Sequence, residues 1–216
     1  MITWLLLLLP LALCGQTQRP FDAAYRFADG VYLSNDALLA NRPDATWEGI
    51  QGEMVQLTDD YRVQIDAFGY ANADYVEPYA IALDGLPYYF VRHDAKRGYH
   101  EFAGLRSSGQ FSTLQYDTLI HSRQLMKAYN PVNGQAFREA YVERDRQRRL
   151  YRILEVSSGR RLPLDRPTVL RLVASESDLV EALSRSDEAD RDRLLRALEI
   201  YNRRYPLLLP LHARTP

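Results

Sequence analysis

Apolar and polar residues alternate in short runs through the middle of the chain, as they do in strands with one buried face. Between Tyr61 and Asp66 every second residue is apolar, and a period of two places alternate side chains on opposite faces of a strand. Residues 54–57 precede this run, and Thr58-Asp59-Asp60 separates the two. The pattern therefore predicts a hairpin over residues 54–66.

Two more hairpins are predicted where turn residues interrupt apolar runs. Asp84-Gly85 separates residues 79–83 from 86–91 and favours a type I′ turn, whose two central residues have positive φ. Ser107-Ser108-Gly109 separates residues 99–105 from 110–116. Segments 30–33 and 150–156 are also predicted to be extended. Short strands at this spacing predict an antiparallel meander.

Helix signals gather in the C-terminal third. Asp165 is placed to cap a helix with Pro167 in its first turn. Residues 175–178 resemble a capping box that opens a helix ending at Ser184. Residues 187–204 begin with acids and end with arginines, which suits the helix dipole. Near the N-terminus, a short helix is predicted from a Ser34 cap to Leu39.

Residues 117–148 are harder to interpret. The segment from Thr118 to Tyr129 is predicted to be helical, with Leu119, Arg123 and Met126 near one face. The segment from Glu139 to Arg149 is too charged for a core, and a solvated helix or loop is expected. Together the patterns predict one α+β domain over residues 17–216, with an antiparallel sheet and helices packed from the C-terminal third.

Residues 1–16 are predicted to be a signal peptide. Trp4 to Leu13 is an uncharged apolar run, long enough for a signal core and shorter than the roughly 20 residues of a bilayer-spanning helix. The mature chain is therefore expected outside the cytoplasm (periplasmic, envelope-associated or secreted) and without a transmembrane span. A lipid anchor at Cys14 is an alternative, although Leu13 is larger than that signal prefers. Ordinary cleavage would remove Cys14, the sole cysteine.

Charge is distributed unevenly along the chain. Residues 20–90 hold 12 acids against three arginines, and residues 91–216 hold 23 lysines and arginines against 16 acids. Folding either brings the two regions together or leaves a basic face suited to a polyanion. The candidates for such a face are arginines between residues 138 and 171: Arg148, Arg149, Arg152, Arg160 and Arg161. An ordinary solvated surface is the competing interpretation.

Tyrosines on a predicted strand are a second set of candidates. Tyr88-Tyr89-Phe90 alternates sides, so one ring is expected in the core and its neighbour at the surface. An exposed ring can stack on a sugar or contact a protein. Tyr88 and Tyr89 are therefore candidate binding residues, against the simpler interpretation of ordinary packing.

Catalytic signatures are missing from the sequence. It contains no G-x-S-x-G, no phosphate-binding glycine loop and no G-x-G-x-x-G. His100-Glu101 begins like a zinc motif, but Gly104 stands where the second histidine belongs. His93 and His100 on neighbouring strands suggest an open metal site, yet solvated histidines explain them as well. No cofactor, metal or catalytic residue is predicted.

Three short motifs resemble those of bacterial exported proteins of unknown function. Phe27-Ala28-Asp29-Gly30-Val31-Tyr32 followed by Asn41-Arg42-Pro43 is similar to their F-x-x-G-x-Y…N-x-P opening. Residues 158–164 and 201–206 are similar to later segments of the same group. The resemblance implies export and a single domain, and it carries over no site residue.

The leading hypothesis is a non-enzymatic exported envelope or secreted protein. It is expected to bind a protein partner or an anionic cell-surface polymer, and nucleic acid is disfavoured by the export signal. The alternative is an envelope glycan hydrolase that uses a carboxylate pair such as Asp59-Asp60 or Asp74 with Glu77, because such enzymes need two acids across the scissile bond.

Overall fold

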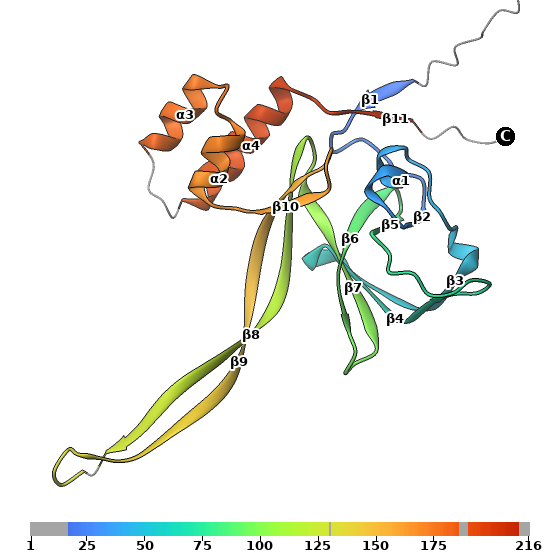
Figure 1. Ribbon diagram of the computed structural model, residues 1–216. Coiled ribbons are helices and arrows are strands. Elements are labelled where there is room, and N and C mark those ends of the chain that lie inside the picture. The colour runs from blue at the N-terminus through green and yellow to red at the C-terminus, as the bar shows by residue number, and fades with distance from the viewer. Residues whose placement is uncertain (1–16, 130, 186–189, 212–216) are drawn as a thin grey trace, which may run out of the picture.

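A computed structural model describes residues 17–129, 131–185 and 190–211. The predicted signal peptide, with Cys14, lies outside these residues, and so does the predicted start of the last helix at Asp187. The chain is rich in antiparallel sheet, and a long two-stranded hairpin extends away from the rest of the molecule (Figure 1). None of the helices in the described residues combines the length and apolar composition that a bilayer crossing requires.

Nine of the described strands form one antiparallel sheet in the order β10-β9-β8-β7-β6-β5-β2, with β4 paired to both β7 and β3. The other two, β1 (Gln18–Pro20) and β11 (Leu208–Pro210), pair with each other. The strands of the large sheet are β2 (Gly30–Tyr32), β3 (Ile50–Leu57), β4 (Arg62–Tyr70), β5 (Ala80–Leu83), β6 (Leu86–Asp94), β7 (Tyr99–Ser107), β8 (Phe111–Tyr129), β9 (Ala136–Glu155) and β10 (Arg160–Pro163). The helices are α1 (Asn35–Leu39), α2 (Arg166–Leu172), α3 (Ser177–Ser184) and α4 (Arg191–Arg204), with 3₁₀ turns η1 (Trp47–Gly49) and η2 (Thr58–Asp60).

The three predicted hairpins are confirmed. β3 pairs with β4 across η2, β5 with β6, and β7 with β8. Between β5 and β6, Asp84 and Gly85 have φ of 54° and 74°, the positive values that a type I′ turn requires. These turns were identifiable because a local sequence determines their backbone geometry.

The helices predicted near the N-terminus and in the C-terminal third are present, with one correction at a cap. Ser34 accepts a hydrogen bond from the Ala37 N–H, and Asp165 accepts one from Thr168. The predicted capping box at the start of α3 is wrong, because the cap residue is Glu176 and its side chain makes no cap bond. Glu176 instead accepts a hydrogen bond from the Tyr205 hydroxyl at 2.6 Å and forms an ion pair with Arg204. These contacts tie the start of α3 to the end of α4.

The predictions for residues 118–129 and 139–149 are wrong, because both segments are strand. They belong to β8 and β9, which pair with each other without a shift from Phe111↔Glu155 to Ala128↔Arg138. Only the ends of these strands nearest the body pair with β7 and β10. Farther along, the ribbon is solvated on both faces, so its sequence lacks the apolar alternation by which a half-buried strand is recognised. Residues 115–129 and 131–151 are called the arm, and the remaining described residues the body.

Two apolar clusters lie on opposite faces of the ribbon where it leaves the body. Leu114 and Leu154 face a cluster that includes Tyr32 and Tyr89. Ile153 and Phe111 face the other way, against α2, α3 and α4. A third cluster, around Phe102, lies under β4, β6 and β7. The predicted antiparallel sheet and C-terminal helices are therefore present, but the chain contains more strand than helix.

Candidate anion-binding site

The strand register sorts the charges of the arm onto two faces. In the regular part of the ladder, every even-numbered residue of β8 is opposite an even-numbered residue of β9, and odd-numbered residues are likewise opposite each other. Since side chains alternate between the faces of a strand, all even positions lie on one face of the ribbon and all odd positions on the other. The even-numbered positions of β9 carry Arg138, Arg144, Arg146 and Arg148 on the arm and Arg152 at its base. Across positions 112–128 and 138–154, this face holds no acid. It is called the arginine face.

The opposite face mixes both signs of charge. The acids of β9 (Glu139, Glu143, Asp145 and Glu155) all occupy odd positions. Lys127 pairs with Glu139 at 2.7 Å, and the Arg123 guanidinium lies 4.2 Å from the centre of the Tyr141 ring. Cations on this face therefore have partners within the arm.

Arginines on the arginine face remain available to a ligand. Arg138, Arg144, Arg146 and Arg148 are all exposed, and within the described residues none of them forms an ion pair. Apolar side chains lie between them, including Met126, which is 44% exposed. A row of unpaired guanidiniums on one face of a ribbon is a surface that attracts anions.

At the base of the arm, the basic surface continues into a cavity of about 490 Å³. Three of the predicted residues, Arg148, Arg149 and Arg152, line it together with Arg191 from α4. The Arg191 guanidinium lies 3.9 Å from the centre of the Tyr151 ring, a cation–π contact that fixes its position. The tertiary structure thus adds a helix residue to the arginines identified on the strand.

The other two predicted arginines do not join this group. Arg160 pairs with Glu155 at 2.8 Å. A hydrogen bond from the Ser158 hydroxyl lowers the pKa of Glu155, and the interaction with Arg160 lowers it further. Arg161 donates a hydrogen bond to the Phe90 carbonyl oxygen at 2.6 Å. Both side chains therefore make contacts within the fold, near the turn that joins β9 to β10.

The prediction of an exposed tyrosine on β6 is wrong. Tyr88 is 4% exposed and Tyr89 is fully buried. They do point to opposite faces, but each face is covered: Tyr89 packs in the cluster with Tyr32, and Tyr88 in the cluster with Phe102. Burial raises the pKa of the Tyr89 hydroxyl. Neither ring is available for stacking on a ligand.

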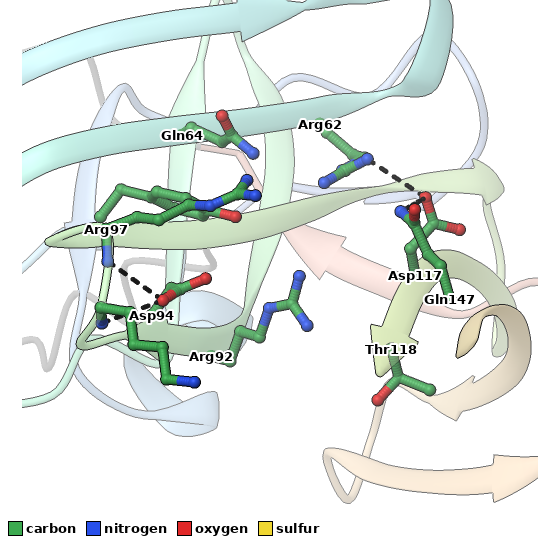
Figure 2. Close-up of a pocket in the computed structure, with 10 residues that line it drawn as sticks. Arg62, Gln64, Arg92, Asp94, Arg97, Asp117, Thr118 and Gln147 are labelled. Carbon is green, nitrogen blue, oxygen red and sulfur yellow. Dashed lines mark hydrogen bonds and ion pairs between the residues drawn. The ribbon is translucent and has the colours of Figure 1, made fainter. Parts of the chain in front are cut away.

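A second polar site lies in a notch between the arm and the body (Figure 2). At its floor Glu101 of β7 is fully buried and forms ion pairs with Arg62 of β4 and Arg92 of β6. The Arg92 Nε–H donates to Glu101 Oε2 at 2.9 Å. Strand pairing places the three residues together. Glu101 is opposite Arg92 of β6 and Gln64 of β4, and Arg62 lies two residues before Gln64, on the same face of β4.

Asp117 connects this cluster to the arm. Its Oδ2 accepts hydrogen bonds from Gln147 at 3.1 Å and from Arg62 at 3.4 Å. On the other side, Arg149 lies 3.5 Å from Asp117 Oδ1. Asp117 thus holds a body arginine and an arm arginine together, and it fixes the arm at the point where it leaves the body.

No sequence pattern predicts this cluster. In the sequence Glu101 belongs only to an incidental zinc-like motif, and Arg62 and Arg92 are far apart in the chain. Cross-strand pairing alone brings them together. The acid pairs proposed for glycan cleavage lie elsewhere. Asp59 is exposed, as are Asp74 and Glu77, and of these three acids only Glu77 lines one of four cavities in the described residues.

The two strand histidines do approach each other. The His93 and His100 rings stack with centroids 4.4 Å apart, and the Tyr75 hydroxyl lies 2.9 Å from His100 Nε2. Burial, together with the charge of His93, lowers the pKa of His100. Within the described residues, no group of three potential metal ligands gathers there or elsewhere.

Comparison of the chain with protein-family models, curated proteins and solved structures gives no match, so the functional argument depends on the geometry of these two sites.

Proposed function

We propose that this protein is exported and that its arm binds an acidic polysaccharide of the cell envelope through the arginine face. One observation carries the proposal: the register places five arginines on one face of β8–β9 and no acid among them. An anionic polymer is the partner whose charge complements that face. No catalytic step is needed for this function.

The spacing of the arginines favours a linear ligand. Alternate residues of a strand lie about 6.8 Å apart, so Arg144, Arg146 and Arg148 present three evenly spaced charges that follow the twist of the ribbon. From Arg138 to Arg152 the face extends over roughly 48 Å. A polymer with repeated negative charges can contact several of these groups at once, and many weak contacts then add up to useful affinity.

The nature of the polymer follows from the expected location. Export, predicted from residues 1–16, places the chain among surface polysaccharides and away from nucleic acid. Polar residues of β8 lie on the same face, with Ser122 opposite Arg144 and Gln124 opposite Val142. The Ser122 hydroxyl donates to the Arg144 carbonyl oxygen and can still accept a hydrogen bond, and the Gln124 amide suits the hydroxyls of a sugar chain. We therefore assign the face to a polysaccharide whose units carry carboxylates.

A paired charge removal tests this assignment. The R144Q/R146Q variant removes two charges from the arginine face, and R123Q/K127Q removes two from the opposite face of the same arm. Binding to polygalacturonate is measured by calorimetry at low and high salt. We expect R144Q/R146Q to bind about three- to tenfold more weakly, because each exposed ion pair contributes about 0.2–1 kcal/mol, and its affinity to depend less on salt.

The control should bind as the unmodified protein does. Equal weakening in both variants would show that net charge alone attracts the polymer and would contradict a face-specific site. Binding of neutral dextran with similar affinity would also contradict it.

A further inference from the structure

We propose that the notch between arm and body binds a single sugar ring that carries a carboxylate. The cavity has a volume of about 260 Å³, and its walls come from β4, β6, β7, the β6–β7 turn and the arm. Ligand cavities usually hold about 300–1,000 Å³, so this space suits one ring. This inference rests on the proposed function in one respect, namely that the sugar belongs to the acidic polysaccharide that the arm binds.

Three guanidiniums surround the space. In Figure 2 the Arg92 and Arg97 side chains extend toward it from different sides, while Arg62 approaches from the side of Asp117. Planar guanidinium groups bind a carboxylate through two parallel hydrogen bonds. Lys96 also lines the cavity and adds a fourth cation.

Two of these cations are held in place before a ligand arrives. Buried Glu101 fixes Arg92 and Arg62 from below. Arg97 lies on the β6–β7 turn, which Asp94 stabilises by accepting the N–H groups of Lys96 and Arg97 at 3.1 and 3.2 Å. Such preorganisation reduces the entropy lost on binding.

The charge balance favours a carboxylate over a phosphate. Arg62, Arg92, Lys96 and Arg97 face Asp94 and Asp117 in the lining, and Glu101 lies beneath them. Arg149, which pairs with Asp117, and Asp60, which lies 4.0 Å from Arg62, add one charge of each sign. The sum is then five positive charges against four negative, which matches a monoanion. The two lining aspartates would repel a phosphate dianion, whereas sugar hydroxyls can donate hydrogen bonds to them.

Neutral polar groups complete the match to a sugar. Gln64 extends into the notch from β4, with Gln147 and Thr118 on the arm side (Figure 2). Amide and hydroxyl groups of this kind serve as both donors and acceptors for ring hydroxyls. An apolar ligand would leave these groups without partners, at a cost in free energy.

The notch adjoins the arginine face. The arm contributes residues of both faces to the notch: Asp117 and Gln147 from the face opposite the arginine face, and Thr118, which pairs across the ribbon with Arg148, from the arginine face itself. A polysaccharide that follows the arginine face to the base of the arm therefore comes to the edge of the notch at Thr118. We infer that the notch receives a terminal or branching acidic sugar, and that the arginine face holds the chain next to it.

Binding of monosaccharides isolates the notch from the arm. Glucuronate, galacturonate, glucose and glucose 6-phosphate are titrated into the 15N-labelled protein and followed by NMR. We expect the two uronates to bind at a single site and shift the amide signals of Lys96, Arg97 and Gln64, with glucose at least about tenfold weaker because it lacks the charge-assisted hydrogen bonds. Glucose 6-phosphate is expected to bind more weakly than glucuronate.

The R97Q variant tests the residues. Arg97 is exposed on a turn, so its replacement should leave the urea midpoint unchanged while glucuronate binding weakens by about fivefold or more. R123Q on the far face of the arm is the control and should bind glucuronate normally. No uronate binding at 20 mM (about the weakest that such titrations detect), tighter binding of glucose 6-phosphate, or equal loss in R97Q and R123Q would overturn the proposal.

The two proposals fail separately. Uronate binding with no effect of R144Q/R146Q on polygalacturonate would support the notch and contradict the arginine face. Weakened polygalacturonate binding in R144Q/R146Q with no uronate binding would support the arginine face and contradict the notch.

Discussion

Arginines of the body and arginines of the arm have opposite surroundings. In the body, Arg62 and Arg92 flank a fully buried carboxylate, which offsets one of their two charges. On the arm, Arg144 and Arg146 are exposed and form no ion pair within the described residues. The same residue type therefore stabilises the structure in one region and presents free charge in the other.

The difference has a simple electrostatic origin. Removing a charge from water costs several kcal/mol unless an opposite charge replaces the lost hydration, so a buried arginine requires an acid such as Glu101. An exposed arginine keeps its hydration and needs no partner. Charges on the arm thus cost the fold little, and they remain free for a ligand.

The largest test of this contrast is Glu101→Gln. It removes the shared acid and leaves Arg62 and Arg92 beside a neutral amide, so we expect a loss of about 3–5 kcal/mol in the free energy of unfolding. Urea denaturation measures it. Glu139→Gln is the matched change on the arm, where the pair with Lys127 is exposed, and should cost less than about 0.5 kcal/mol. Similar losses in both variants would contradict the contrast.

A second test compares two leucines of the same hairpin. Leu154 at the base of β9 is fully buried, so Leu154→Ala should cost about 3 kcal/mol through lost burial and the cavity left behind. Leu125 on the arm is 38% exposed, and Leu125→Ala should change stability by about 0.5 kcal/mol or less. Thermal unfolding of both variants checks the difference. A large effect at Leu125 would indicate that something else covers the arm.

The third and smallest test uses acid. His100 has a lowered pKa in the folded state, so the unfolded chain takes up the proton first, near pH 6.5. Stability should therefore fall as the pH drops below about 6.5 and stop falling from this cause once the folded imidazole is also protonated. One proton limits this slope to about 1.4 kcal/mol per pH unit.

The His100→Phe variant isolates that contribution. Its urea midpoint should change less between pH 7.5 and pH 5 than that of the unmodified protein, because phenylalanine takes up no proton. The carboxylates contribute equally to the pH dependence of both proteins. The side chains facing His100 are Tyr75, His93, Phe68 and Phe90, and the body holds all of them. Identical pH profiles for the two proteins would show that His100 does not titrate between the folded and unfolded states.

Prediction from sequence succeeded where local chemistry decides the structure. Asp84-Gly85 specified a turn through its backbone preferences, and Asp165 specified the start of α2 through its cap. It failed for residues 118–129 and 139–149, because strand pairing at a distance stabilises the arm. It also failed for the pair Tyr88 and Tyr89, both of which are buried, since whether a ring on a strand is exposed depends on what covers that face.

By itself, the sequence determined the sheet-forming hairpins, the C-terminal helices and an excess of arginine between residues 138 and 171. Only the tertiary structure decided which arginines act together. In a helix, residues 144, 146 and 148 would spread around the axis at 100° per residue, whereas in a strand they share one face. Pairing across strands also placed Glu101 between Arg62 and Arg92, and no local pattern specifies a contact of that kind.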